Sequence, residues 1–177
     1  FTTFLEPFFF KEKLKGQNVM MAVFVFAGLC LVVPSFDLQD QATRGVFWGT
    51  VSGLTFAILS LINRAVVRNT PPTVVAFWQN LVAALVLAPL ALSASIGLGA
   101  YEVSMLAALG IFCTALAHTL FIQSLRFIST QTASVISSLE PVYGIALAWI
   151  VLGEVPGLRM LIGGAMILAA AFVSSKS

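Results

Sequence analysis

Charged residues are scarce in this chain. Asp, Glu, Lys and Arg make up 9% of its 177 residues, whereas a soluble domain carries roughly 25%. With 59% hydrophobic residues and a mean hydropathy of +1.02, the chain cannot cover a globular surface with polar groups, which excludes an ordinary soluble domain. The net charge of +2 is small and the basic residues fall between apolar runs, so a nucleic-acid partner is not expected. We therefore take the lipid bilayer as the solvent of this chain.

Histidine and cysteine are almost absent as well. The chain has one histidine, His118, and two cysteines, Cys30 and Cys113, which stand in separate apolar runs. Protein zinc sites use three or four such ligands at characteristic spacings, so we expect no metal, and nothing in the sequence indicates a cofactor. The HExxH motif of zinc proteases is missing too. We therefore expect that the protein is not an enzyme.

Long apolar runs take up most of the chain. About 20 apolar residues cross a bilayer as a helix, and strand-like alternation is absent, so we expect an all-α, polytopic membrane helix bundle rather than a barrel. We count six full spans and one partial span, whose short connections predict antiparallel neighbours in one compact bundle. The partial span covers 1–10, and the full spans cover 18–33, 45–62, 72–92, 103–125, 130–154 and 156–173. The span at 45–62 is expected to end at Asn63, Arg64 and Arg68.

Basic residues lie mainly on one side of these spans. Short loops rich in Lys and Arg stay in the cytoplasm. One side would hold seven basic residues, and the other would hold only Arg44 and Arg159. The seven are Lys11, Lys13, Lys15, Arg64, Arg68, Arg126 and Lys176. We therefore expect an integral protein of the plasma (inner) membrane with its C-terminus in the cytoplasm.

A carboxylate and a helix-breaking residue interrupt the span at 130–154. Glu140 is followed at once by Pro141, and Ser137 lies about one turn before them. Charged residues inside spans usually face a protein interior or a water-filled path, where they serve ions or solutes. Proline bends the helix and frees a backbone carbonyl. Glu140 could therefore carry protons for transport, or its carboxylate could have a structural role and cap backbone amides of a neighbouring kinked helix.

Five further polar or aromatic side chains could contact a solute. A histidine could relay protons, and amides inside a span need partners, either on other helices or on a solute. The alternatives are packing and hydrogen bonds between helices. These candidates are His118, Trp78, Gln79, Asn80 and Tyr143.

Small residues mark surfaces where we expect helices to pack. Gly45, Gly49 and Gly53 recur every four residues, and Gly163 and Gly164 lie in the last span. Glycine stripes let helices approach each other closely. The stripe at Gly45 could equally serve sliding of one helix past another during alternating access.

The beginning and the end of the chain share one pattern. When Glu12 is placed on Glu154, both segments read as an apolar helix end, a glutamate, a short turn and an apolar span. The basic residues put the two glutamates on opposite sides of the membrane, which is typical of inverted-repeat transporters. Glu6-Pro7 resembles Glu140-Pro141 but stands at a different distance from the following glutamate, so we do not equate the two pairs. Glu6 is a weaker site candidate.

The run SSLEPVYGIALAWIVLGE, preceded by GIFCTALAHTLFIQSLRFISTQTA, resembles the second half of an EamA-type member of the drug/metabolite transporter superfamily. Glu140-Pro141, Gly153-Glu154 and the Gly/Ala-rich last helix carry the resemblance, and Lys11 replaces the glycine of the corresponding helix end in the first copy. The family implies ten helices in two inverted five-helix repeats and the transport of small metabolites. Of these, the chain would hold one complete five-helix repeat and the end of the other.

These observations together predict an integral membrane secondary transporter that exports or exchanges small organic metabolites or drugs. We expect the end of the first EamA repeat at 1–35, an extracytoplasmic linker at 36–43 and the second repeat at 44–175. The partners would be a small-molecule solute, the lipid bilayer and the N-terminal half of the same protein, which we expect to be missing here; a homodimer would be compatible with this. The alternatives are a non-transporting membrane scaffold or receptor and an intramembrane enzyme.

Overall fold

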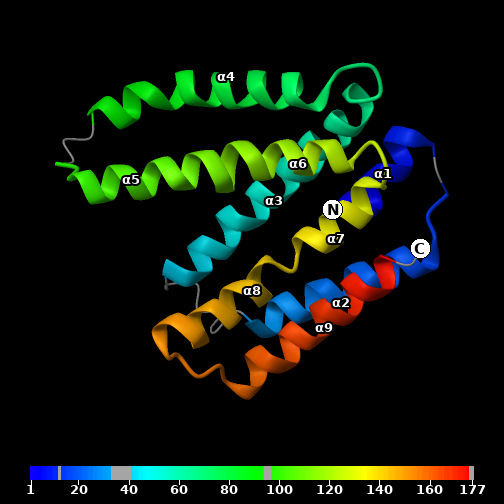
Figure 1. Ribbon diagram of the computed structural model, residues 1–177. Coiled ribbons are helices and arrows are strands. Elements are labelled where there is room, and N and C mark those ends of the chain that lie inside the picture. Colours follow the sequence, from blue (N-terminus) through cyan, green and yellow to red (C-terminus); the bar gives the residue numbers. More distant parts are fainter. Residues whose placement is uncertain (12, 33–40, 94–96, 176–177) are drawn as a thin grey trace. The chain divides into compact units, whose positions relative to one another are not determined.

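The computed structural model describes residues 1–11, 13–32, 41–93 and 97–175, and its regular structure in these ranges is entirely helical (Figure 1). The elements are α1 Thr2–Phe10, α2 Gly16–Val32, α3 Gln41–Val66, α4 Pro72–Ser93, α5 Ala100–Ala108, the π-helical segment η1 Leu109–Leu116, α6 Ala117–Ser124, α7 Thr130–Ser137, α8 Glu140–Leu147, the π-helical segment η2 Ala148–Leu152, and α9 Leu158–Ser174.

Four stretches of helix are long and apolar enough to cross a membrane. They are Phe47–Val66, Pro72–Ser93, Ala100–Ser124 and Thr130–Leu152. Two shorter apolar helices, α2 and α9, have 17 residues each. A helix closes its backbone hydrogen bonds within one segment, which is why an apolar chain takes this form in lipid. The expected all-helical membrane protein is confirmed.

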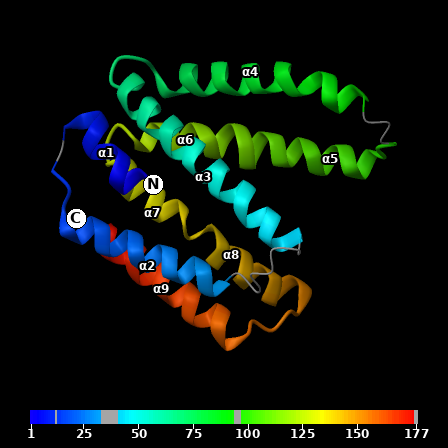
Figure 2. The same ribbon diagram turned by 180° about the vertical axis from the view of Figure 1, so that it is seen from behind.

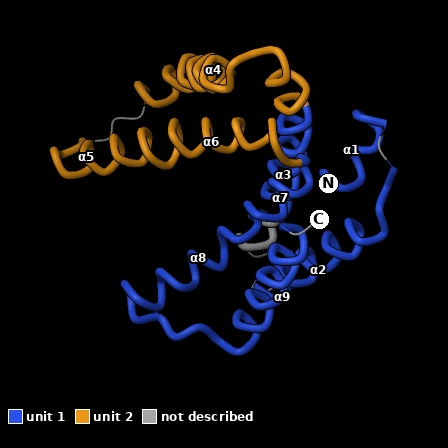
Figure 3. The backbone as a smooth tube through the Cα atoms, turned by 45° about the vertical axis from the view of Figure 1, so that its right-hand side comes forward, with its two compact units in different colours: residues 1–61, 129–177 blue, residues 62–128 orange. Residues whose placement is uncertain are grey.

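The helices fall into two units, coloured separately in Figure 3. The large unit contains Phe1–Leu61 and Ser129–Ser177, and the small unit contains Ile62–Ile128. The single compact bundle expected from the short connections stays a prediction. The boundaries of the two units differ from the expected boundaries of the repeats. The repeat boundaries stay a prediction. Most of the expected linker at 36–43 lies outside the described residues.

Helices α2 and α9 of the large unit lie side by side (Figures 1 and 2). They meet through two glycines: a Cβ added to Gly163 would lie 2.6 Å from the backbone oxygen of Gly28, and one added to Gly28 would lie 2.8 Å from that of Gly163. Lipid gives little hydrophobic drive for helices to associate, so close backbone contact at small residues is the main source of attraction. Helix α7 packs beside this pair, and the three helices share a core made of Met21, Val135, Ala170 and Ala171.

Two left-handed residues end apolar helices of the large unit. Gly153 ends η2 with φ 70° and ψ 15°, and Lys11 ends α1 with φ 53° and ψ 29°. The tight helix end therefore forms at Lys11 even though a Cβ disfavours this conformation. The register that places Glu12 on Glu154 thus also aligns these two helix ends and the two 17-residue helices α2 and α9 that follow them. Glu12 itself lies outside the described residues.

The small unit is built on α4, which packs against α6 and η1. Helix α3 reaches this unit and ends at Val66, so Asn63 and Arg64 lie inside the helix, and our prediction that they end it is wrong. The guanidinium of Arg126 closes the turn beyond α3: its Nε donates to the Val67 carbonyl at 2.9 Å and its Nη2 to the Thr70 carbonyl at 3.0 Å. These bonds satisfy two carbonyls of the turn that follows α3.

The remaining predicted packing glycines differ in their surroundings. A Cβ added to Gly45 or Gly49 would meet no atom of the described chain within 4 Å, and one added to Gly53 would meet only the Phe1 ring, at 3.7 Å. Gly164 would meet only a Val142 methyl, at 3.9 Å. A packing or sliding role for the stripe in α3 stays a prediction.

The contact between α2 and α9 predicts unequal effects at adjacent glycines. Gly163→Ala should lower the free energy of unfolding by about 1–3 kcal/mol, because the new methyl group forces two backbones apart. Gly164→Ala, the matched control, should be neutral or stabilising by up to about 1 kcal/mol, because alanine is the better helix former. Thermal unfolding in detergent, followed by circular dichroism, measures both. Equal losses would contradict the close contact.

Candidate functional site

The span that carries the Glu-Pro pair is interrupted. Helix α7 ends at Ser137, a turn follows at Ser138 and Leu139, and α8 begins at Glu140 with Pro141 in its first turn. Proline fits the first turn of a helix, where its missing N–H would have no partner anyway. The bend expected at Pro141 is therefore present, as a break between two short helices of the large unit.

Most of the predicted site residues at this break have exposed side chains. Glu140, Ser137 and Tyr143 are exposed and Pro141 is half-buried, and among the described residues no hydrogen bond or ion pair is recorded for the Glu140 carboxylate. A carboxylate in the first turn of a helix is favoured by the helix dipole. The capping of a neighbouring helix, which was one reading of Glu140, is not observed for this residue.

Glu6 makes that capping contact instead. Its side chain is 5% exposed, and its carboxylate accepts hydrogen bonds from the backbone N–H groups of Thr130, at 2.8 Å, and Gln131, at 3.2 Å. The Ser129 hydroxyl caps the same helix end by accepting from the Thr132 N–H at 3.1 Å. Because these amides have no partner within α7, Glu6 satisfies them and ties α1 to α7 inside the large unit. Sequence reasoning treated Glu6 as a weaker site candidate and did not predict this contact with the start of α7.

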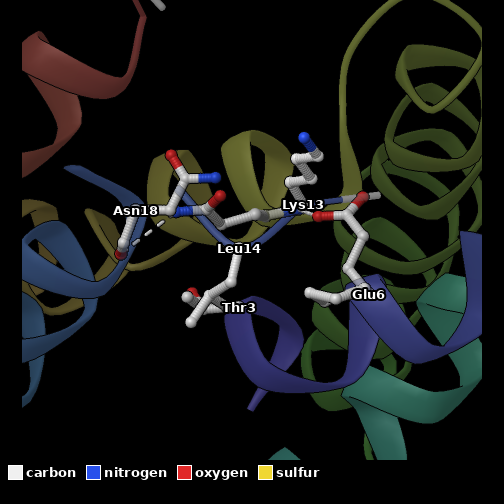
Figure 4. A pocket seen from close by; sticks show the side chains of 7 residues that line it. Thr3, Glu6, Lys13, Leu14 and Asn18 are labelled. Atoms are coloured by element: carbon white, nitrogen blue, oxygen red, sulfur yellow. Dashed lines mark hydrogen bonds between the residues drawn. The ribbon is translucent and has the colours of Figure 1, made fainter. Parts of the chain in front are cut away.

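A small polar cavity adjoins Glu6 (Figure 4). Its volume is about 20 Å³, and it is lined by Thr3, Glu6, Pro7, Lys13, Leu14, Asn18 and Gln131. This space holds about one water molecule and no organic solute. The Gln131 amide spans it by donating to the Asn18 carbonyl at 3.3 Å. The cavity therefore belongs to the tie between the helices and is no solute site.

Three polar side chains form one hydrogen-bonded chain in the small unit. Gln79 of α4 donates through Nε2 to Oδ1 of Asn63 at 2.6 Å, and Oε1 of Gln79 lies 2.9 Å from Nε2 of His118 in α6. The predicted candidates Gln79 and His118 are thus brought together. Asn63, the third member, is 1% exposed, and its Nδ2 has no hydrogen-bond partner among the described residues. Sequence reasoning missed Asn63 because we took it for the end of a helix.

The neighbours of Gln79 are placed differently. Trp78 is exposed and its ring meets that of Phe77 edge to face, with the centroids 5.6 Å apart, while Asn80 is half-buried. Neither residue has a recorded hydrogen bond to the chain of three side chains. Solute contacts of Trp78 and Asn80 stay a prediction.

Metal-binding chemistry finds no support in the described residues. No group of three or more His, Cys, Asp or Glu side chains there could hold an ion. Both cysteines are free, with Cys30 half-buried and Cys113 exposed. The described residues offer hydrogen-bonding side chains and three exposed carboxylates, those of Glu102, Glu140 and Glu154.

Apolar spanning helices that contain hydrogen-bonded amides and an interrupted span define a polytopic membrane protein. Residues 43–176 match the EamA-like transporter family. The chain belongs to this family.

Two relatives of the chain support this assignment. It is 30% identical over 169 residues to the uncharacterized transporter YxxF of Bacillus subtilis (strain 168), an overlap that covers 93% of this chain and 54% of that protein. It is 25% identical over 164 residues to an uncharacterized transporter of Archaeoglobus fulgidus, covering 92% of this chain and 58% of that protein. The chain thus spans little more than half the length of these relatives. No solved structure matches it.

The two glutamates of the Glu-Pro pairs should differ in their effect on stability. Glu6→Gln should lower the free energy of unfolding by about 1.5–3 kcal/mol, because a carboxylate that receives two backbone hydrogen bonds is lost. Glu140→Gln, the matched control, should change it by less than about 0.5 kcal/mol, as surface substitutions do. Chemical unfolding in mixed micelles compares the variants. A larger loss at Glu140 would show that the roles are reversed.

Proposed function

We propose that the protein is a secondary transporter that exports or exchanges a small organic solute across the plasma membrane, with the C-terminus of this chain in the cytoplasm. The observation that carries the proposal is the interrupted span, in which the exposed Glu140 opens α8 directly after the break. Transporters use such discontinuous helices to bind solutes and coupling ions near the middle of the bilayer. Membership of the EamA-like transporter family supports the same conclusion.

A two-repeat architecture belongs to this proposal. In one register, the left-handed helix ends at Lys11 and Gly153 and the helices α2 and α9 coincide. The distribution of basic residues gives the two segments opposite orientations. We therefore assign 44–175 to one complete repeat and 1–35 to the end of an inverted partner, within a protein of ten helices.

The competing functions make different demands on the same residues. A scaffold or receptor gains little from the partly buried chain of Asn63, Gln79 and His118, because polar groups inside the membrane are costly. An intramembrane enzyme would have to change its solute chemically. A flux measurement combined with product analysis can therefore distinguish both alternatives from a transporter.

The decisive experiment reconstitutes the protein in liposomes and follows labelled amino acids, organic acids, nucleosides and a cationic dye, each under an imposed pH gradient. At least one solute should cross faster than in protein-free liposomes and be recovered chemically unchanged by chromatography. Protein-dependent conversion of a solute would indicate an enzyme, and the absence of flux for every probe would count against transport.

Glu140→Gln tests whether this carboxylate couples transport to protons. If Glu140 carries the proton, flux should persist in the variant but lose most of its response to the gradient, because glutamine cannot titrate. Glu102→Gln is the matched control, since Glu102 lies in the first turn of α5 and in a different part of the chain. An unchanged response in Glu140→Gln would assign the coupling to another group.

A further inference from the structure

In the hydrogen-bonded chain of Asn63, Gln79 and His118, each hydrogen bond has a defined donor and a defined acceptor. An amide offers one acceptor oxygen and one donor NH₂ group, and a neutral imidazole offers one donor and one acceptor nitrogen. Gln79 uses its oxygen toward His118 and its nitrogen toward Asn63. Any change in the hydrogen bond at one end of Gln79 must therefore turn the amide over and change the bond at the other end.

Only two arrangements satisfy both contacts of Gln79. In the first, the one the structure shows, His118 donates from Nε2 to Gln79, and Gln79 donates to Asn63 Oδ1. The Nδ2 donor of Asn63 is then left over. In the second, both amides are turned over, Gln79 donates to an unprotonated Nε2, and the Oδ1 acceptor of Asn63 is left over.

The group left over in the first arrangement is a buried donor. Asn63 is 1% exposed, and its Nδ2 meets no acceptor among the described residues. A buried donor without a partner carries a free-energy cost. An acceptor oxygen that reaches Nδ2 removes this cost and stabilises the first arrangement over the second.

The protonation state of His118 selects between the same arrangements. An imidazolium has donors on both nitrogens, so it fits the first arrangement only. A neutral ring fits the first arrangement with its proton on Nε2 and the second with its proton on Nδ1. A proton on His118 and an acceptor oxygen at Asn63 therefore both favour the first arrangement, and each raises the affinity for the other by displacing the neutral protein that occupies the second.

Few other titratable groups lie on the helices around Asn63, Gln79 and His118. Helix α4 carries none, η1 carries only Cys113, and α6 has no other besides His118. Farther along the same span, α5 carries Tyr101 and Glu102, and Arg64 is the neighbour of Asn63 in α3. No carboxylate from the elements packed against α6 competes for the proton.

We propose that Asn63, Gln79 and His118 form a proton-linked binding site for a carboxylate or carbonyl oxygen of the transported solute. The oxygen accepts from Nδ2 of Asn63, and the linked proton resides on His118. This inference rests on the proposed transport function and specifies its solute class as compounds that carry such an oxygen. A carboxylate bound in this way would travel with its compensating proton.

The single histidine of the chain makes the proposal directly measurable. With ¹⁵N-labelled histidine and an affinity tag free of histidine, solid-state NMR in bilayers follows the protonation of His118 against pH. Sodium acetate serves as the probe. The proton affinity of His118 should rise about fivefold or more with saturating acetate, within the usual range of coupling between linked sites.

Variants separate the amide relay from a simple effect of the acetate charge. Asn63→Leu should abolish the response to acetate, and Asn80→Leu, which changes an amide outside the chain, should keep it. Asn63→Asp offers acceptor oxygens only, so it should hold the first arrangement and raise the proton affinity of His118 without acetate. Circular dichroism checks that each variant is folded.

The proposal is overturned if acetate leaves His118 unchanged in the wild type, which would leave an ordered water as the partner of Nδ2. It is also overturned if acetate acts equally in Asn63→Leu, or if Asn63→Asp does not raise the proton affinity. Flux of a solute in liposomes together with any of these results would refute the relay but keep the transport function. Absence of flux would refute the transport function itself.

Discussion

The carboxylate of Glu6 on the first amides of α7 is the contact on which the large unit depends. Helix α1 has nine residues and α7 has eight, and helices this short are not stable alone. Burying a charge is costly unless it is hydrogen-bonded, and two backbone N–H groups at the positive end of a helix meet that demand. With the start of α7 fixed in this way, the break after Ser137 separates it from α8, and among the described residues no hydrogen bond or ion pair is recorded for the Glu140 carboxylate.

Each of the two units is stabilised internally by a different kind of contact. In the large unit, Gly28 and Gly163 bring the backbones of α2 and α9 into contact. In the small unit, Gln79 links α3 to α6 through hydrogen bonds. Such bonds contribute modestly to stability in membranes, which is one reason why we propose a role in transport for these three polar side chains. Membership of the EamA-like transporter family agrees with that role.

Much of the fold could be predicted from the sequence, because lipid leaves an apolar chain little choice but helices. The helices α1, α2, α4 and α9 begin and end within a few residues of the expected positions, and the bend at Pro141 followed from the missing N–H group. The partners of polar groups could not be predicted. Whether Glu6 or Glu140 caps a helix, and whether Asn63 ends α3 or lies buried in it, depends on contacts between segments far apart in sequence. The π-helical segments η1 and η2 gave no signal in the sequence either.

The central claim is that the two Glu-Pro pairs have opposite roles, a structural one for Glu6 and a functional one for Glu140. Labelling the protein in liposomes with a hydrophobic carbodiimide, followed by peptide mass spectrometry, tests this claim most directly, because the reagent modifies protonated carboxyl groups that it can reach from the lipid. Glu140, which is exposed, should be modified, while Glu6, which is 5% exposed and bound by two amides, should not. Modification of Glu6 at the same rate as Glu140, or of Glu6 alone, would contradict the account.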